Sequence, residues 1–313
     1  MPLRVPEPYA VGDPRANGDA WVLMQAMPRG KRVIEWQPGD TLESLRNLAA
    51  LHARYLDAAP AALPRPFSSE LEQTLAFVPE GIRMLRQRYD ELPELPRVVS
   101  DRQLDLLAAL AARPGVLRAA FERSPETLLH GDYHRGNIVA RDGAPQIVFD
   151  WQFSCAGPPA YDLAVFWIYL GAINKPGLFR LIDRVEVRER ELPWQEITAA
   201  YGAALQELRA DADLEAILSC ADAVVSWEAL RQIIYMGHGM ETMMGQMCFI
   251  YRDHRTVGGW FARWLGIDQT WKLWADLFAE VETRAPRLLG ASAAARGDGA
   301  LAPDTMPSLS DRS

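Results

Sequence analysis

The sequence predicts an α+β fold in which a mostly helical chain holds one short antiparallel β-hairpin. Apolar residues recur at helical spacing over much of residues 40–284, and this periodicity indicates helices that each bury one face. Two short runs rich in β-branched residues flank a turn cluster at residues 141–145, which predicts the hairpin. With 313 residues and 49% hydrophobic content, the chain can bury a large core as one large domain or two lobes.

The helices are expected in the middle and C-terminal parts of the chain. An apolar run at residues 21–27, ended by Pro-Arg-Gly, predicts a strand ahead of them. Asp40 and Glu43 form a capping-box pattern at the start of the first helix. The predicted helices cover residues 40–56, 69–89, 100–112, 160–170, 193–208, 213–237 and 268–284. Pro79 and Gly81 are expected to break or kink the second of these helices. Residues 285–313 are mainly Ala, Gly, Ser and Pro with isolated charges, which predicts a disordered tail.

The hairpin brings polar residues together that are distant in the sequence. Its strands are predicted at residues 138–140 and 146–149. Because the strands are antiparallel, Asn137 before the first strand is expected opposite Asp150 after the second. An amide oxygen and a carboxylate are therefore expected beside Asp132.

The densest cluster of reactive side chains is the run His-Gly-Asp-Tyr-His-Arg-Gly-Asn at residues 130–137. It places an acid, two imidazoles and an amide just ahead of the hairpin. Mg²⁺ is commonly bound by one or two protein oxygen ligands together with substrate phosphates, so Asn137 and Asp150 are a sufficient pair. Asp132 then remains free to accept the proton of an attacking hydroxyl group, and the pattern indicates phosphoryl transfer.

This pattern resembles the catalytic loop of the protein-kinase-like fold, in which His-x-Asp-x-x-x-x-Asn is followed by a metal-binding Asp. The variant here continues with Phe-Asp-Trp-Gln and Gly-Pro-Pro-Ala-Tyr-Asp-Leu-Ala. It is more similar to the small-molecule kinases, namely the aminoglycoside phosphotransferases, the choline kinases and the ecdysteroid-kinase-like proteins. The match is specific over about residues 125–170 and diffuse over about residues 20–285.

The resemblance implies an ATP-dependent phosphotransferase that acts on a hydroxyl group of a small molecule. Asp132 is then the catalytic base, and Asn137 and Asp150 are the Mg²⁺ ligands. Asp162 is expected to anchor the catalytic loop from the start of the next helix. The acceptor is not specified, since an aminoglycoside, choline, a sterol or another alcohol fits the pattern.

The remaining roles implied by the resemblance are supporting ones. His130 and His134 are expected to support the catalytic loop. The strand at residues 21–27 corresponds to the end of the N-terminal lobe and the hinge. The backbone of Gln25, Ala26 and Met27 is therefore expected to face the adenine of ATP.

The N-terminal lobe of such kinases contributes a Gly-rich turn, a lysine and a helical glutamate that clamp the phosphates. Twenty residues precede Trp21, and they contain neither a lysine nor a Gly-x-Gly-x-x-Gly pattern. We therefore expect residues 1–39 to be a remnant of the N-terminal lobe and hinge, and residues 40–284 to be the C-terminal lobe. The chain is then a shortened kinase, a nucleotide- or ligand-binding module without turnover, or a kinase whose clamp comes from a partner chain.

Two further alternatives concern individual residues. His130, Asp132 and His134 alternate as the ligands of a zinc hydrolase do on one strand, although the glycines around them favour a loop. A second group recurs at helical spacing and predicts either core packing or the wall of a substrate pocket. Its members are Trp227, Arg231, Tyr235, His238 and Glu241.

Composition limits the partners and the location. A net charge of −8 disfavours nucleic acid and anionic membranes, which bind basic surfaces. No run approaches the roughly 20 apolar residues of a membrane span. Cys155, Cys220 and Cys248 have no metal-binding or redox spacing and are expected as buried thiols in a reducing compartment. We therefore expect a cytoplasmic protein with a small-molecule partner, and its oligomeric state stays open.

Overall fold

The computed structural model describes residues 4–11, 22–31, 33–90, 95–176, 183–187, 192–239 and 270–295. The elements up to the hairpin are β1 (Pro8–Val11), β2 (Val22–Met24), η1 (Val33–Glu35), α2 (Pro38–Tyr55), α3 (Leu71–Leu75), α4 (Val78–Gln87), α5 (Leu95–Val98), α6 (Asp101–Ala111), α7 (Pro114–Phe121), β3 (Thr127–Leu129), η2 (Arg135–Asn137), β4 (Ile138–Arg141) and β5 (Ala144–Val148). The elements that follow are η3 (Trp151–Phe153), β6 (Cys155–Gly157), α8 (Ala160–Tyr169), β7 (Ala172–Pro176), β8 (Asp183–Val187), α9 (Trp194–Leu208), α10 (Leu214–Leu218), α11 (Ala221–Gly239) and α14 (Thr270–Ala295).

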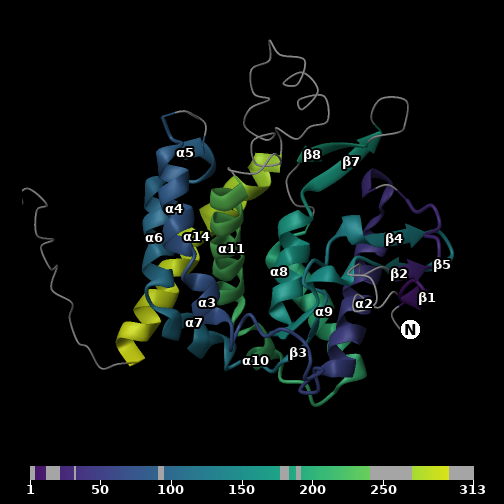
Figure 1. The fold of residues 1–313 in the computed structure, drawn as a ribbon. Helices are drawn as coiled ribbons and strands as arrows, with labels where there is room; N and C mark the ends of the chain where they lie inside the picture. Colours follow the sequence, from purple (N-terminus) through teal and green to yellow (C-terminus); the bar gives the residue numbers. More distant parts are fainter. Residues whose placement is uncertain are drawn as a thin grey trace, which may run out of the picture.

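Helix α11 lies at the centre of the helical body (Figure 1). It packs against α4, α14 and α8, whereas α2 packs against α9 on the side of the β4–β5 hairpin. Trp227 of α11 and Phe278 of α14 are among the largest fully buried side chains, and Tyr161 and Phe166 of α8 join them in one continuous core. The predicted mostly helical α+β architecture is confirmed.

All strand pairs in the described residues are two-stranded and antiparallel: β1 with β2, β3 with β6, β4 with β5, and β7 with β8. The predicted hairpin is β4–β5, with Ile138 opposite Val148. The sequence predicted neither β1, β3–β6 nor β7–β8. Strands of three to five residues, some containing proline, are too short for a periodic pattern to stand out.

The predicted break near Pro79 is confirmed. The helix predicted over residues 69–89 is divided into α3 and α4, with Pro79 in the first turn of α4, where a missing N–H costs nothing. The predicted start of the first long helix is wrong. The first long helix begins at Pro38, so Asp40 is not its cap. The Asp40 carboxylate instead accepts a hydrogen bond from the backbone N–H of Gln37, at 2.7 Å.

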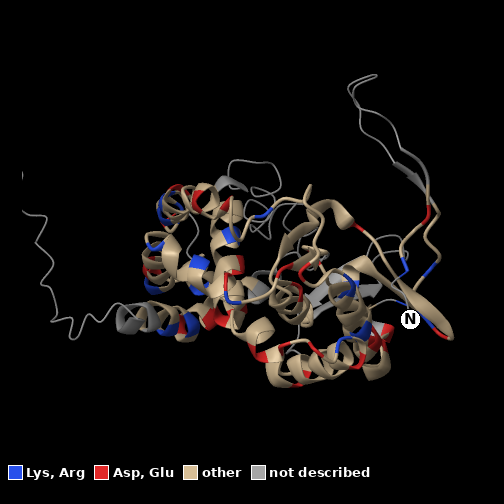
Figure 2. Ribbon diagram, turned by 90° about the horizontal axis from the view of Figure 1, so that it is seen from below, with Lys and Arg blue, Asp and Glu red and all other residues tan. Residues whose placement is uncertain are grey.

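The predicted start of the tail at residue 285 is also wrong. Helix α14 continues to Ala295, because its Ala-rich end favours a helix and Ala285 is buried against the core. Residues 296–313 lie outside the described part. Along the described helices, basic and acidic positions are interspersed (Figure 2). None of the described helices is both long enough and apolar enough to cross a membrane.

Two glycines allow the backbones of α4 and α11 to touch. A Cβ at Gly237 would lie 2.5 Å from the Cα of Gly81, and a Cβ at Gly81 would lie 2.8 Å from the carbonyl oxygen of Ile233. Backbone atoms on both sides cannot move aside as a flexible side chain does. This crossing therefore fixes how closely the central helix approaches α4.

We expect Gly237→Ala to lower the free energy of unfolding by about 1–3 kcal/mol, because the added methyl overpacks the crossing. Gly115→Ala is the matched control, since a Cβ at Gly115 on α7 meets no atom within 4 Å. The control should leave stability unchanged or raise it slightly. Urea unfolding measures both, and equal stability of the two variants would show that the crossing is not tightly packed.

Candidate active site

A buried carboxylate on α8 holds the start of the 130–137 loop. The Asp162 oxygens accept hydrogen bonds from the backbone N–H groups of His130, at 2.7 Å, and Gly131, at 2.9 Å. The side chain of Asp162 is fully buried, and His52 Nε2 lies 3.4 Å from its Oδ2. The structure gives α8 no side-chain N-cap, so Asp162 does not cap its own helix. It ties α8 to the loop instead.

Gly131 has the backbone conformation that this attachment requires. Its φ angle is +82°, in the left-handed region, and a Cβ there would overlap the carbonyl oxygen of Phe153. The loop therefore passes very close to the segment that follows the hairpin. Since β3 ends at Leu129, residues 130–134 form a turn and not the alternating strand of the zinc-hydrolase alternative.

Asp132, His134 and Asn137 meet within this loop. Asn137 Nδ2 donates to Asp132 Oδ2 at 2.9 Å, and to the backbone oxygen of Asp132 at 2.9 Å. His134 Nε2 lies 3.4 Å from the same carboxylate oxygen, and His134 Nδ1 accepts from the Gly136 N–H at 2.9 Å. In the neutral ring, Nε2 therefore carries the proton and faces Asp132. Since the amide nitrogen of Asn137 faces Asp132, the amide oxygen is the atom left for a cation.

These contacts keep Asp132 ionised. Partial burial raises the pKa of the Asp132 carboxyl, but the hydrogen bond and charge of His134, with smaller contributions from Asn137 and His130, lower it by more. The net pKa is below the ordinary value of aspartate. The carboxylate is therefore available as a proton acceptor at neutral pH.

Asp150 follows the hairpin in an unusual conformation. Its φ and ψ angles are 64° and 60°, the left-handed region that residues other than glycine adopt at a cost of roughly 1 kcal/mol. Asn137 lies opposite Phe149 and not Asp150, because the Phe149 N–H donates to the backbone carbonyl oxygen of Asn137 at 3.1 Å. The predicted register is wrong by one residue, since β5 ends at Val148 and the chain turns at Asp150. Asp150 is thus next to the residue paired with Asn137, and it is exposed.

His130 joins the two halves of this arrangement. Its ring is buried, its Nε2 donates to the Phe149 carbonyl oxygen at 2.8 Å, and its Nδ1 accepts from the Asp132 N–H at 3.3 Å. Both ring nitrogens therefore bond to backbone groups. One of these groups belongs to Asp132 and the other precedes Asp150.

The predicted hinge residues Gln25, Ala26 and Met27 lie directly after β2. The Gln25 N–H donates to the Glu7 oxygen at 2.7 Å, and further on the Lys31 N–H donates to the Ala140 oxygen of β4, also at 2.7 Å. This segment therefore crosses from the β1–β2 pair to the hairpin. Among the described residues, no backbone hydrogen bond links these three residues to Asp132 or Asp150.

A second backbone contact lies near the hairpin. The Val148 N–H donates to the Arg4 oxygen at 2.9 Å, and Arg4 forms a parallel bridge with Ile147. A single bridge of this kind has no sequence pattern. It brings the N-terminal segment beside the strand that leads to Asp150.

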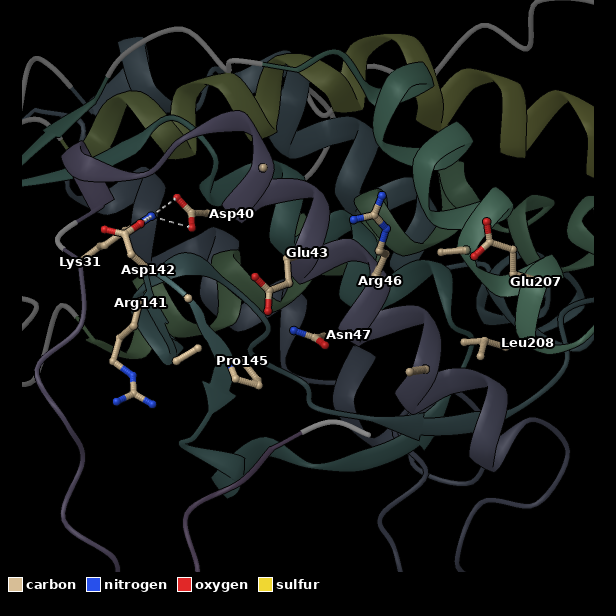
Figure 3. Close-up of a pocket in the computed structure, with 15 residues that line it drawn as sticks. Lys31, Asp40, Glu43, Arg46, Asn47, Arg141, Asp142, Pro145, Glu207 and Leu208 are labelled. Carbon is tan, nitrogen blue, oxygen red and sulfur yellow. Dashed lines mark hydrogen bonds and ion pairs between the residues drawn. The ribbon is translucent and has the colours of Figure 1, made fainter. Parts of the chain in front are cut away.

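Lys31, the lysine nearest the predicted hinge, is bound by two carboxylates. Its Nζ lies 3.0 Å from Asp40 Oδ1 and 2.7 Å from Asp142 Oδ1, and the hydrogen bonds to Asp142 and Asp40 raise the pKa of Lys31. These residues line a cavity of about 590 Å³ between the hairpin turn, α2 and α9 (Figure 3). A smaller cavity of about 240 Å³ includes Gly131 in its wall. Thus one cavity adjoins the hairpin turn, and the other contacts the 130–137 loop.

The profile of the phosphotransferase enzyme family matches residues 2–210. This chain belongs to the phosphotransferase enzyme family. It is 34% identical to an uncharacterized protein of Deinococcus radiodurans over 166 residues, which are 49% of this chain and 44% of that protein. It is 31% identical to a methylthioribose kinase of Yersinia pestis over 161 residues, 49% of this chain and 38% of that enzyme. These matches span less than half the length of either relative.

The fold is that of the protein-kinase-like small-molecule kinases. A choline kinase of Cryptosporidium parvum superposes with a TM-score of 0.51 at 10% identity, over 88% of this chain and 73% of that one. The predicted family and fold class are therefore confirmed. The functional roles of the site residues stay predictions, and the structure describes how these residues are arranged.

We expect Asp162→Asn to lower the free energy of unfolding by about 1–3 kcal/mol, because an amide nitrogen would then face a buried N–H group. Asp90→Asn is the matched control, since Asp90 is exposed. Chemical denaturation compares the two. Equal stabilities would show that the Asp162 carboxylate does not hold the loop.

We expect His134→Ala to raise the pKa of the Asp132 carboxyl, since the hydrogen bond and charge of His134 lower it. A carboxylate with a lowered folded-state pKa stabilises the fold above its unfolded-state pKa, and this contribution is lost as the pH falls through the folded-state pKa. The substitution should therefore shift that loss to higher pH.

A ¹³C NMR titration of the aspartate carboxyls measures this shift. Asp211, whose pKa Arg209 lowers, is an internal reference that should not change. An unchanged or lower pKa for Asp132 in the variant would contradict the assigned contact.

Proposed function

We propose that this chain is a small-molecule kinase that transfers the γ-phosphoryl group of ATP to a hydroxyl group of its acceptor. The observation that carries the proposal is the hydrogen bond from Asn137 Nδ2 to Asp132 Oδ2, in a loop anchored by Asp162. Membership of the phosphotransferase family supports the reaction class. The use of ATP, the use of Mg²⁺ and the nature of the acceptor are parts of this proposal.

Asp132 is proposed as the catalytic base. Its carboxylate accepts the proton of the acceptor hydroxyl as the oxygen forms a bond to the γ-phosphorus, and the electron pair of the broken P–O bond leaves with ADP. A lowered pKa makes Asp132 a weak base, so its main effect is to orient the hydroxyl and to take the proton late. His134 keeps the carboxylate ionised and in place.

The oxygen atoms near the hairpin suit Mg²⁺. The amide oxygen of Asn137 and the carboxylate of Asp150 are hard ligands, and the exposure of Asp150 leaves room for water and phosphate oxygens. These two residues are proposed to hold the ion. Bound there, Mg²⁺ would neutralise charge on the nucleotide phosphates.

The nucleotide base is proposed to contact the backbone of Gln25, Ala26 and Met27. Residues 1–39 would then form the N-terminal part with the hinge, and the C-terminal lobe would extend from residue 40 to the end of α14 at Ala295. Cys155 and Cys220 are buried free thiols, which supports a reducing, cytoplasmic location.

A second candidate function is nucleotide or ligand binding without turnover. The specific observation in its favour is that Asp40 and Asp142 already neutralise Lys31, so this lysine is not free to bind phosphate groups. The two functions differ in whether Mg–ATP turns over. Both use the loop and the hairpin described above.

Asp132→Asn should lower kcat by roughly 10² to 10⁴, because the amide cannot accept the proton. Methylthioribose, choline and an aminoglycoside are suitable acceptors to test, with ADP release as the measurement. Asp90→Asn, at an exposed aspartate after α4, is the matched control and should retain most of the activity. Undiminished turnover by Asp132→Asn would exclude the base, whereas Mg–ATP binding without turnover by the unmodified chain would favour the second candidate.

A further inference from the structure

The cavity of about 240 Å³ lies beside the catalytic loop. Gly131 and residues 152–155 form one wall, and Tyr161 of α8 with Trp227 and Arg231 of α11 forms another. Asp132, the proposed base, is the residue after Gly131. The cavity therefore lies where part of an acceptor molecule can extend from the reacting hydroxyl.

Aromatic rings give this cavity rigid walls. The ring of Phe67 lies 5.0 Å from that of Tyr161 and 5.7 Å from that of Trp227, centroid to centroid. Tyr161 and Trp227 are both about 1% exposed. Packed aromatic faces suit a ring or an alkyl group of the ligand, including the apolar face of a sugar.

Arg231 is held at this wall by a buried glutamate. Its Nη1 lies 3.1 Å from Glu228 Oε2 and also donates to the Tyr161 hydroxyl. The Tyr161 hydroxyl donates to Glu228 Oε2 at 2.7 Å, and Gln232 Nε2 donates to Glu228 Oε1 at 2.6 Å. Three donors therefore contact the buried Glu228 carboxylate, and Arg231 neutralises its charge.

The donors of the cavity remain partly unused. No described residue accepts from the Nε or Nη2 of Arg231, whose side chain is 36% exposed. The indole N–H of Trp227 also has no hydrogen-bond partner within the described residues, but it is buried and out of reach of a ligand. A ligand with acceptor oxygens can instead accept hydrogen bonds from the partly exposed guanidinium group of Arg231. Glu70 is the one carboxylate among the described lining residues.

We propose that this cavity binds the part of the acceptor that carries oxygen atoms without positive charge, such as a neutral sugar or a sugar acid, and that Arg231 selects it. The inference rests on the proposed function, because it assigns the acceptor of the same site. A polyamine would place an ammonium group beside Arg231 with Glu228 already neutralised. Arg231 therefore disfavours polycationic acceptors.

The inference can be tested with the paired variant Arg231→Met/Glu228→Gln, which removes the buried carboxylate together with its cation and so avoids an unpaired charge. Arg118→Met/Glu72→Gln, an exposed ion pair between α7 and α3, is the matched control. The probes are methyl β-D-ribofuranoside, D-glucuronate and kanamycin. Calorimetry measures the dissociation constant of each probe, and steady-state kinetics measures KM for the acceptor and for ATP.

We expect the unmodified chain to bind the riboside or the glucuronate, and the Arg231 variant to weaken that binding at least tenfold while the control does not. Kanamycin should bind more weakly than either. Three results would overturn the inference. The first is that the unmodified chain binds kanamycin more tightly than both other probes, and the second is that it binds neither the riboside nor the glucuronate at millimolar concentration. The third is that the Arg231 variant binds the riboside and the glucuronate as tightly as the unmodified chain does.

The two proposals fail in different ways. Arg231-dependent binding without phosphoryl transfer to any probe would leave the binding site intact and overturn the kinase function. If phosphoryl transfer occurs but the KM for the acceptor does not depend on Arg231, the kinase function stands and the inference about the acceptor is overturned. An unchanged KM for ATP in the variant would show that the effect is confined to the acceptor.

Discussion

The site depends on the bonds that the buried carboxylate of Asp162 makes to the backbone of the catalytic loop. A charge without access to water requires hydrogen-bond donors at close range, and the N–H groups of His130 and Gly131 supply them. The loop is therefore positioned by α8, a helix whose residues Tyr161 and Phe166 belong to the buried core. His52, which bonds to Tyr201 of α9 at 2.8 Å, extends this connection to α2 and α9.

Other contacts hold the loop from the side of α2. The hydroxyl of Tyr133 donates to the Ser44 oxygen at 2.7 Å, and Arg135 Nη2 donates to Thr41 Oγ1 at 2.8 Å. Tyr133 and Arg135 therefore point into the body of the protein, while the half-buried Asp132 and the buried Asn137 contact each other within the loop. Alternate residues of the loop thus serve the fold and the chemistry, which explains why so many polar groups lie close together here.

The motif and the hairpin could be predicted because both depend on residues that are close in the sequence. The turn cluster at residues 141–145 and the β-branched runs around it act locally, and so does the spacing of Asp132 and Asn137. The register at Asp150 could not be predicted, since it depends on a left-handed residue that the sequence does not mark. The cavity beside Gly131 also has no local pattern, because its walls come from separate segments. The helical spacing of Trp227 and Arg231 was the available signal, while Tyr235 is exposed and the side chains of His238 and Glu241 lie outside the described residues.

The central claim is that the loop and the hairpin bring Asp132, Asn137 and Asp150 to one cation and one nucleotide. Anomalous diffraction from Mn²⁺, in crystals grown with a non-hydrolysable ATP analogue, tests it most directly. We expect a metal peak within coordination distance of the Asn137 amide oxygen and the Asp150 carboxylate, with Asp132 beside the γ-phosphate. A peak at other residues, or side chains of Asn137 and Asp150 that face different regions, would contradict it.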